Sequence, residues 1–178
     1  MIARPFRGWP AGCRCMRIVG VLAMIAFVYW RGGVPAWAGQ WIMGTLSIRD
    51  DNGRLVYGEY VTVFLTTQHI PVPRSSGLEA MERHRRLDRI NQLHLDYYKQ
   101  FARHRSQKGY LAAQAETSET GNFAFLNVPP GRYFIVVTFP AMVGGYKVAW
   151  QHPVSVTADR RPYVALNEDN LVLPAVRR

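Results

Sequence analysis

The sequence predicts a mainly β protein, an antiparallel β-sandwich interrupted by one long amphipathic helix. Short segments of alternating apolar and polar residues, separated by Gly, Pro, Asn and Asp, occur before residue 69 and again after residue 111. This pattern is typical of strands that bury one face. Between these two regions, residues 77–108 lack proline, and from Leu87 onward the apolar residues recur with the period of a helix. With 178 residues, the chain is long enough for one domain of ordinary size.

The first predicted strand covers residues 41–49, where apolar and polar positions alternate. A turn over residues 50–53 follows, because its Asn-Gly pair supports the positive φ angles of hairpin turns. A short apolar step then leads into a second strand over residues 60–66, which is rich in β-branched and aromatic residues. Further strands are predicted after the helix, at 113–117, 122–128, 132–139, 146–152, 154–157 and within 163–173. Together they give about seven or eight short strands, as in a sandwich.

Two blocks of sequence resemble a known family. Residues 44–64 read GTLSIRDDNGRLVYGEYVTVF, and residues 117–133 read TSETGNFAFLNVPPGRY. Both are similar to the carboxypeptidase regulatory-like (transthyretin-like, or prealbumin-like) domains of bacterial exported proteins. The resemblance covers about half of the chain and implies an Ig-like or prealbumin-like sandwich that serves as an accessory or binding module.

The residues of this signature are interpreted as turn and core positions rather than as a ligand groove. Glycines permit the turns, the Pro-Pro-Gly reversal fixes the entry into a central strand, and the aromatic residues fill the core or a corner. The positions concerned are Gly53, Gly58, Gly121, Phe123, Phe125, Pro130, Gly131 and Tyr133.

Residues 1–38 have the plan of a secretory signal peptide. Arginines precede an apolar run over residues 18–30, and Ala-Trp-Ala ends at Ala38. We therefore expect cleavage after Ala38, a single domain over residues 39–178, and a periplasmic or extracellular location. The alternative is an uncleaved anchor, although 13 residues of helix span only about 20 Å. Translation could begin at Met1 or at Met16. Both cysteines of the chain fall within the leader.

Charge is distributed unevenly along the chain. The net charge is +10, and the leader contributes five arginines and no acidic residue. Most of the remaining excess lies in residues 78–108, which contain eight basic and four acidic residues. Because the rest is close to neutral, the sequence disfavours a nucleic-acid-binding domain.

The segment at about 77–108 departs from the family pattern. Ser76 and Glu79 fit a capping box, and Gly109 fits a helix end. From Leu87 onward, aromatic and apolar residues form one stripe. This stripe could pack on the sandwich, meet a partner protein or a second copy, or lie on a membrane surface, which the central acidic residues disfavour. As candidate partner-binding residues the sequence offers Arg85, Arg86, Arg89, Tyr97, Tyr98 and Phe101.

The sequence offers no catalytic motif, and we expect neither an enzyme nor a bound cofactor or metal. Acidic pairs at 50–51 and 168–169 could bind Ca²⁺, but such residues are more often turn formers. We therefore expect an exported, non-catalytic module for protein interaction or assembly, whose partner is an envelope or extracellular protein or a second copy. The alternative is a carbohydrate-binding domain, for which four aromatic residues could stack on sugars: Trp41, Tyr146, Trp150 and Tyr163.

Overall fold

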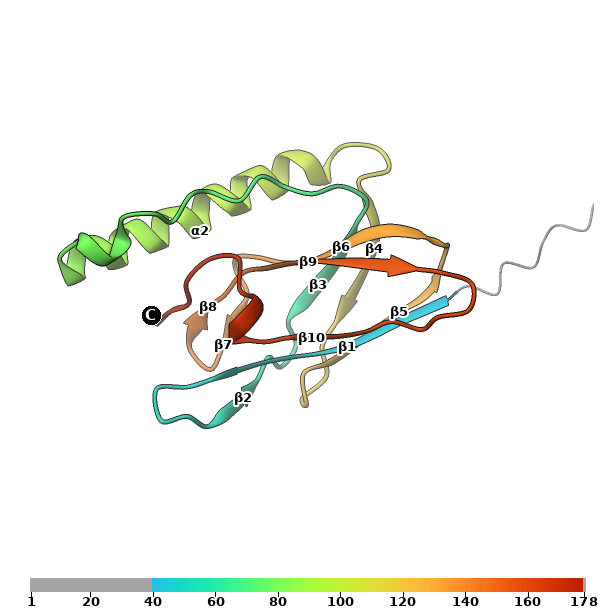
Figure 1. Cartoon of the computed structure of the whole chain (residues 1–178), viewed down its shortest axis with the longest axis horizontal. Helices are drawn as coiled ribbons and strands as arrows, with labels where there is room; N and C mark the ends of the chain where they lie inside the picture. Colours follow the sequence, from blue (N-terminus) through green and yellow to red (C-terminus); the bar gives the residue numbers. More distant parts are fainter. Residues whose placement is uncertain (1–39, 178) are drawn as a thin grey trace, which may run out of the picture. The chain divides into compact units, whose positions relative to one another are not determined.

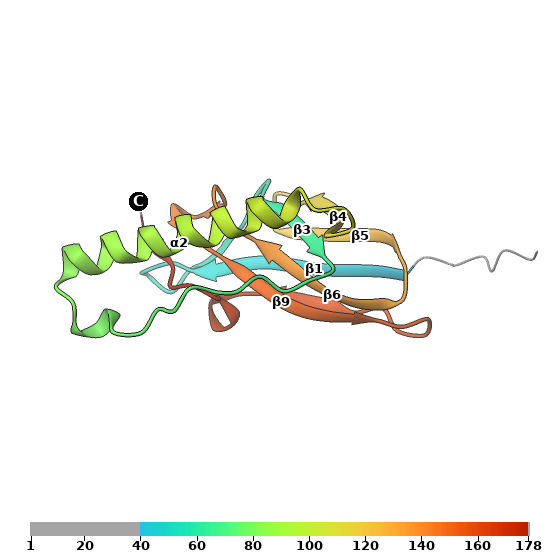
Figure 2. The same cartoon turned by 90° about the horizontal axis from the view of Figure 1, so that it is seen from above.

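The computed structural model describes residues 40–177, which form two large packed β-sheets, a small third sheet, and one long helix against the outer face of one large sheet (Figures 1 and 2). The fold is mainly β and antiparallel, as the sequence predicted. The predicted signal peptide and its cleavage site lie outside the described residues. Within residues 40–177, no helix is both long enough and apolar enough to cross a membrane.

The first sheet is organised around β1 (Gln40–Arg49). Its neighbours are β10 (Tyr163–Leu166), which is parallel, and β5 (Asn122–Val128) and β2 (Leu55–Tyr57), which are antiparallel. Even-numbered positions of β1 point into the core and odd-numbered positions point outward. The alternation predicted for residues 41–49 is therefore confirmed.

The second sheet has the order β4–β3–β6–β9, and all its strands are antiparallel. Its members are β4 (Leu111–Glu116), β3 (Thr62–Thr66), β6 (Gly131–Val137) and β9 (Trp150–Val156). The sequence predicted a break at Pro153, but β9 continues through it. Because β9 is an edge strand, a residue without an N–H group is tolerated there.

Three short strands form a third, smaller sheet. These are β7 (Met142–Val143), β8 (Tyr146–Lys147) and β11 (Val176–Arg177). The strand predicted over 146–152 is thus divided between β8 and β9. The region 163–173 contains β10 and then a 3₁₀ turn, η2 (Glu168–Asn170), rather than further strand.

The core lies between the two large sheets and includes the aromatic residues of the signature block. Phe123 and Phe125 from β5 are both buried, with ring centroids 5.8 Å apart. Tyr133 on β6 is buried, and its hydroxyl donates a hydrogen bond to the Pro129 carbonyl oxygen at 3.0 Å. This bond ties the start of β6 to the preceding Pro-Pro-Gly reversal.

Gly121 lies in the turn that joins the two sheets and has φ of 71°. A Cβ atom there would overlap the carbonyl oxygen of Leu46 on β1. The turn approaches β1 this closely because the Leu46 N–H donates to the Gly121 carbonyl oxygen at 2.9 Å. Glycine is therefore required both by the backbone angle and by the space.

The predicted helix begins later than the sequence suggested. Residues 78–80 form a 3₁₀ turn, η1 (Leu78–Ala80), Met81 is extended, and α2 covers Arg83–Arg105. The predicted capping box does not form, because Gly77 has φ of 80° and Glu82 is the residue that precedes the helix. Met81 and Glu82 have ψ of 147°, which is not helical and separates η1 from α2, while Leu78 of η1 is buried in a core cluster.

The apolar side of α2 packs on the outer face of the β4–β3–β6–β9 sheet. Phe101 lies 4.7 Å from Phe64 of β3, measured between ring centroids. A second core cluster forms there, also from Ile70, Ile90, Leu93, Tyr97, Tyr110, Val136 and Ala149. The segment between β3 and η1 runs alongside the helix (Figure 2). Of the alternatives for the apolar stripe, packing on the chain's own sandwich is the one observed.

Candidate functional site

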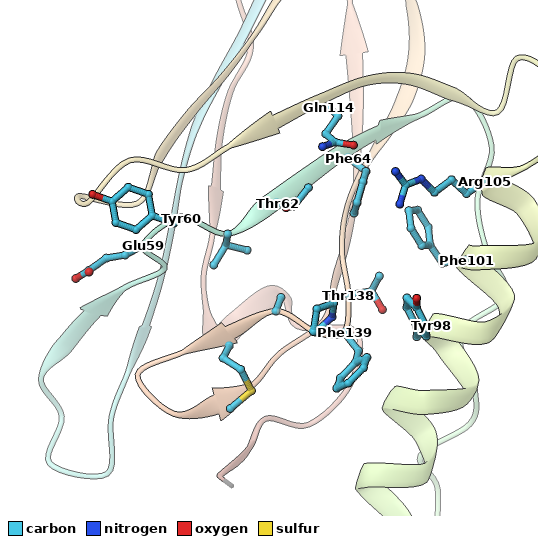
Figure 3. A pocket seen from close by; sticks show the side chains of 14 residues that line it. Glu59, Tyr60, Thr62, Phe64, Tyr98, Phe101, Arg105, Gln114, Thr138 and Phe139 are labelled. Atoms are coloured by element: carbon cyan, nitrogen blue, oxygen red, sulfur yellow. The ribbon is translucent and has the colours of Figure 1, made fainter.

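A pocket of about 350 Å³ lies where the C-terminal half of α2 leaves part of the sheet uncovered (Figure 3). Four parts of the chain line it. The helix supplies Tyr98, Phe101 and Arg105, and β3 and β4 supply Thr62, Phe64 and Gln114. The loop after β6 and the start of β7 supply Thr138, Phe139 and Met142, and the segment before β3 supplies Glu59 and Tyr60. Phe64 and Gln114 are on adjacent strands and are register partners.

Aromatic rings form the apolar wall of this pocket. Phe64 and Phe101 are in tilted contact, and Tyr98 meets Phe139 edge to face with centroids 5.6 Å apart. Phe64 and Phe101 are buried, whereas Tyr98 is half-buried and Phe139 is exposed. Tyr98 and Phe139 can therefore contact a bound group without a change in the core.

Arg105 provides the cation of the pocket. Its guanidinium carbon lies 5.1 Å from the centroid of the Phe64 ring, in a cation–π arrangement. Among the described residues Arg105 forms no ion pair. The guanidinium group is thus positioned by an aromatic face while its donors stay available to an anionic group.

The side of the pocket away from the helix is acidic. Glu59 and Tyr60 lie there, across the pocket from Arg105 (Figure 3). The Tyr60 hydroxyl donates to Glu119 at 2.7 Å, and this bond is the main cause that raises the pKa of Tyr60. The pocket therefore has a cation at one end, carboxylates at the other and aromatic rings between them.

Thr138 belongs to the lining and is 4% exposed. Its hydroxyl oxygen is buried and has no hydrogen-bond partner in the part of the chain that the structure describes. An unpaired buried hydroxyl is unfavourable by about 1–3 kcal/mol. Sequence reasoning did not identify Thr138, Phe139 or Arg105, because residues 105 and 138 meet only through the tertiary packing of α2.

The six predicted partner-binding residues do not lie together on one surface of the structure. Tyr97 is 0% exposed and lies outside the pocket lining, so the prediction that it faces a partner needs correction. Phe101 is 1% exposed but lines the pocket, so its contact with a partner stays a prediction. Both residues belong to the side of α2 that covers the sheet. Tyr98, one step around the helix, lines the pocket.

The three predicted arginines lie in the N-terminal part of α2, away from the pocket. Arg85 pairs with Glu82 at 3.8 Å, and Arg86 pairs with Glu79 at 3.6 Å. Arg89 is exposed. Exposed pairs of this kind contribute about 0–1 kcal/mol, so these arginines remain surface groups with only local partners.

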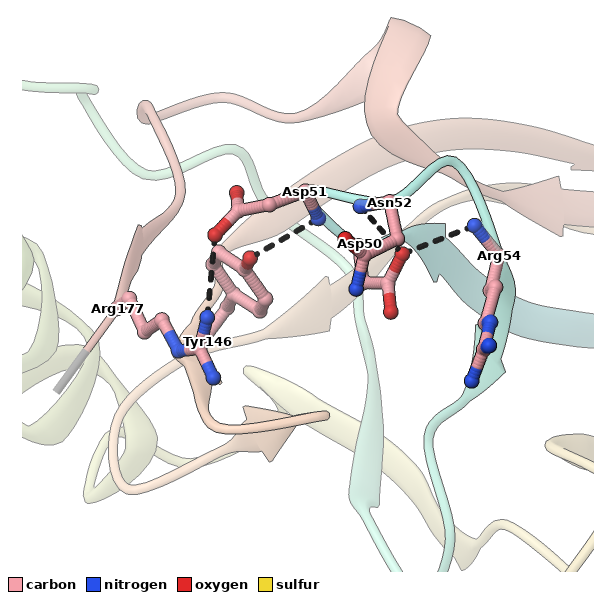
Figure 4. A network of polar contacts seen from close by, with 6 residues as sticks. All are labelled: Asp50, Asp51, Asn52, Arg54, Tyr146 and Arg177. Carbon is pink, nitrogen blue, oxygen red and sulfur yellow. Dashed lines mark hydrogen bonds and ion pairs between the residues drawn. The ribbon is translucent and has the colours of Figure 1, made fainter.

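The acidic turn after β1 is held by hydrogen bonds and by an ion pair with the C-terminal strand (Figure 4). One Asp50 carboxylate oxygen accepts from the Asn52 and Arg54 N–H groups at 2.8 and 2.9 Å. Asp51 pairs with Arg177 at 3.1 Å, and its N–H donates to the Tyr146 hydroxyl at 3.2 Å. Tyr146, and then Arg177, hold the pKa of the Asp51 carboxyl below its ordinary value.

These contacts use the carboxylates that the calcium alternative would need as ligands. The turn carboxylates are engaged by the chain itself, and Glu168 pairs with Arg49 at 3.4 Å. Within residues 40–177, no group of three or more His, Cys, Asp or Glu side chains could hold a metal ion. The acidic turn joins the β1–β2 connection to the C-terminal strand β11.

Two of the four aromatic residues considered for sugar stacking are unavailable to a ligand by burial. Trp150 and Tyr146 lie in the core, and the Trp150 indole N–H donates to the Asn167 carbonyl oxygen at 2.8 Å. Trp41 and Tyr163 are exposed on the outer face of the first sheet. The carbohydrate alternative therefore rests on these two residues alone.

No protein-family model matches this chain, and no curated protein matches it either. The resemblance to carboxypeptidase regulatory-like domains thus stays a prediction. A candidate carbohydrate-binding protein from Pseudomonas aeruginosa is similar in structure, with 15% identity, a TM-score of 0.42, and coverage of 74% of this chain and 89% of that chain.

Two pilus proteins are also similar in structure. For the major pilin subunit of Bacillus cereus the identity is 14% and the TM-score 0.36, over 75% of this chain and 30% of the pilin. For the pilus backbone protein of Streptococcus pneumoniae the values are 7% and 0.34, over 72% and 41%. All three TM-scores lie below 0.5, and this chain spans less than half the length of either pilus protein.

Proposed function

We propose that this protein is an exported β-sandwich module that binds another protein, and that the pocket between α2 and the sheet is its docking site. The observation that carries this proposal is the position of Arg105. The inserted helix places this guanidinium group over Phe64, at the mouth of an aromatic pocket and without an ion pair among the described residues.

The size and lining of the pocket favour one large apolar side chain next to an acidic group. A volume of about 350 Å³ is at the lower end of the range for ligand pockets. The rings of Tyr98 and Phe139 suit an aromatic or aliphatic side chain. Arg105 suits a carboxylate, because its planar donors match one in two parallel hydrogen bonds.

The pocket also adjoins the edge of a sheet. Gln114 lies on β4, the edge strand of the β4–β3–β6–β9 sheet. An edge strand presents backbone N–H and C=O groups that an extended segment can pair with. A partner segment could thus place one side chain in the pocket while its backbone follows β4.

Site-specific photocrosslinking in the native host tests this proposal. A photoreactive residue at Gln114 should give a discrete protein adduct, and Arg105→Glu should remove the adduct. The matched control is Arg103→Glu, which makes the same charge change on the same helix outside the pocket lining. A Gln114 adduct that survives Arg105→Glu, or the absence of an adduct, would contradict the proposal.

Export is tested separately. Mass spectrometry of the protein from the envelope or the medium should find a mature chain that begins at Gly39, because Ala36-Trp-Ala38 fits the small-x-small site of signal peptidase. A chain that keeps its leader in the cytosol would contradict export and leave the pocket proposal intact.

Carbohydrate binding is a second candidate, favoured by one observation. Trp41 and Tyr163 are exposed on the same sheet face. Arg161 lies over the Trp41 ring at 5.6 Å, so one face of that ring is already occupied. A glycan array tests this candidate, with Tyr163→Ala as the variant that should lose any signal. An array without hits would remove it.

A further inference from the structure

The outer face of the first sheet carries a group of exposed apolar side chains. Trp41 and Met43 of β1 are 46% and 40% exposed, Leu126 of β5 is 58% exposed, and Tyr163 of β10 is 63% exposed. We call these four residues the open face. Large apolar side chains gathered on one surface of a soluble protein mark an interaction site more often than isolated ones do.

The register of the strands makes the open face continuous. Met43 is paired with Tyr163 on one side and with Ala124 on the other. Trp41 lies two residues before Met43 on the same side of β1, and Leu126 lies two residues after Ala124 on β5. Side chains two apart on a strand point the same way, so these residues are neighbours on one surface.

Charges of opposite sign lie at the two ends of the open face. At the Trp41 end, the turn between β9 and β10 carries Arg160 and Arg161 beside a single acid, Asp159. The Arg161 guanidinium carbon lies 5.6 Å from the Trp41 ring centroid. This end therefore has a net positive charge, directly next to the apolar residues.

The other end of the open face is acidic. Met43 and Tyr163 share a groove of about 470 Å³ with Tyr60, Glu116 and Asn122. Glu119 accepts from the Tyr60 hydroxyl at 2.7 Å, and Glu59 and Glu116 are close enough to raise its pKa further. Asn122 is paired with Thr45, four residues beyond Trp41. Because strands rise about 3.3 Å per residue, the two ends are on the order of 13 Å apart.

We propose that the open face binds the open face of a second copy of this chain in a two-fold dimer. The two-fold axis lies in the plane between the two faces and is perpendicular to β1. Such an axis reverses the strand direction between the copies. The arginines at 160 and 161 of each copy then face the glutamates at 116 and 119 of the other, and this contact occurs twice. A two-fold axis along the strands would instead place like charges together, which is unfavourable.

The apolar residues account for the affinity in this arrangement and the charges account for the orientation. Aromatic residues and methionine are the residue types enriched in protein interfaces. The open face has them at its centre, and its charged groups lie at the rim. A rim of complementary charge selects the orientation of the partner more than it increases affinity. The groove at the acidic end of the open face and the pocket at α2 both include Tyr60. The apolar residues of the open face and Arg105 of the pocket belong to one site each, so either proposal can fail without the other.

Sedimentation velocity over a range of protein concentrations tests the dimer. The wild-type protein should show a monomer–dimer equilibrium. The variant R160E/R161E places four like charges together, and so does E116R/E119R, so each should raise the dissociation constant about tenfold or more. The control is R103E/R132E, which makes the same charge change away from the open face and should leave the equilibrium unchanged.

Mixing the two variants is the decisive measurement. In a mixed dimer, the acidic residues at 160 and 161 of one chain face the basic residues at 116 and 119 of the other. The remaining contact keeps its natural charges, so an equimolar mixture should recover the wild-type dissociation constant. A wild-type protein that is monomeric at every concentration overturns the proposal, and so does a mixture that associates no better than its components.

Discussion

The two outer faces of this sandwich carry the same kind of side chain, but only one of them is covered. On the β4–β3–β6–β9 sheet, Phe64 and Val136 point outward and are buried by α2. On the β10–β1–β5 sheet, Met43 and Tyr163 also point outward and are exposed. The comparison shows that an apolar residue on an outer face belongs to the core or to a surface only according to what packs on it.

Truncation of one aromatic residue on each face should produce the largest difference. Phe101→Ala removes a buried ring between α2 and β3, and we expect it to lower the free energy of unfolding by about 3–5 kcal/mol. Tyr163→Ala on the open face should change it by no more than about 0.5 kcal/mol. Urea unfolding of both variants at a concentration where the protein is monomeric measures the difference. Equal losses would show that α2 does not complete the core.

A substitution at Gly44 tests how tightly the inner side of the first sheet is packed. A Cβ atom at residue 44 would overlap the Val164 carbonyl oxygen and lie 2.5 Å from the Phe123 ring. We expect Gly44→Ala to reduce the free energy of unfolding by about 1–3 kcal/mol, because β1 and β10 would have to move apart. Ser47→Ala, on the outer side of the same strand, is the control and should have a small effect in thermal unfolding. A stable Gly44→Ala variant would show that this sheet is loosely packed.

Removal of a buried hydroxyl beneath α2 should increase stability. The Tyr97 hydroxyl is buried without a hydrogen-bond partner among the described residues. Tyr97→Phe should therefore raise the free energy of unfolding by about 1 kcal/mol, since the unpaired group is removed without loss of packing. Tyr133→Phe is the matched control and should lower the free energy of unfolding, because it loses a hydrogen bond of 3.0 Å to the Pro129 carbonyl oxygen. Calorimetry of both variants checks the prediction, and a destabilised Tyr97→Phe variant would contradict it.

The covered face contains a buried histidine, His94, that should make the folded protein less stable in acid. Burial, together with the nearby Lys147 charge, lowers the pKa of His94 below its ordinary value of 6.5, although its bond to the Pro174 carbonyl oxygen at 2.9 Å acts the other way. The unfolded chain thus binds a proton at higher pH than the folded chain does. The stability linked to His94 is therefore complete above pH 6.5 and is lost as the pH falls toward the lowered pKa.

His94→Gln identifies this contribution to the pH dependence. An amide at position 94 can still donate to Pro174 but cannot gain a proton near neutral pH. The free energy of unfolding, measured between pH 7 and pH 5, should fall less in the variant than in the wild type. Profiles with the same slope would assign the acid sensitivity to another group.

The strands could be predicted because their signals are local. The alternation along residues 41–49 set the inward positions of β1, and Asn122–Val128 was predicted with the bounds that the structure shows. Turn glycines such as Gly53 and Gly121 have the positive φ angles that their position implied. The start of α2 was predicted too early, because Met81 and Glu82 interrupt the helical backbone and local capping signals did not reveal this break.

The candidate site could not be predicted, because its parts are distant in sequence. Arg105, Gln114 and Thr138 look ordinary in isolation, and only the packing of α2 on the sheet brings them to one pocket. The helical period correctly placed Tyr97 and Tyr98 on the apolar side of α2. It could not show that the sheet would bury the first and leave the second at the rim of a pocket.

By itself, the sequence determined that this protein is a β-sandwich with an amphipathic helix, because periodicity and turn chemistry act over a few neighbouring residues. Tertiary structure decided which apolar residues are core and which are surface. The stripe of α2 became core by packing on β3 and β6, whereas Trp41 and Met43 on the outer side of β1 stayed exposed. The apolar and polar pattern along a strand or helix sets the direction in which each side chain points. Whether that side chain is buried depends on which other part of the chain packs against it.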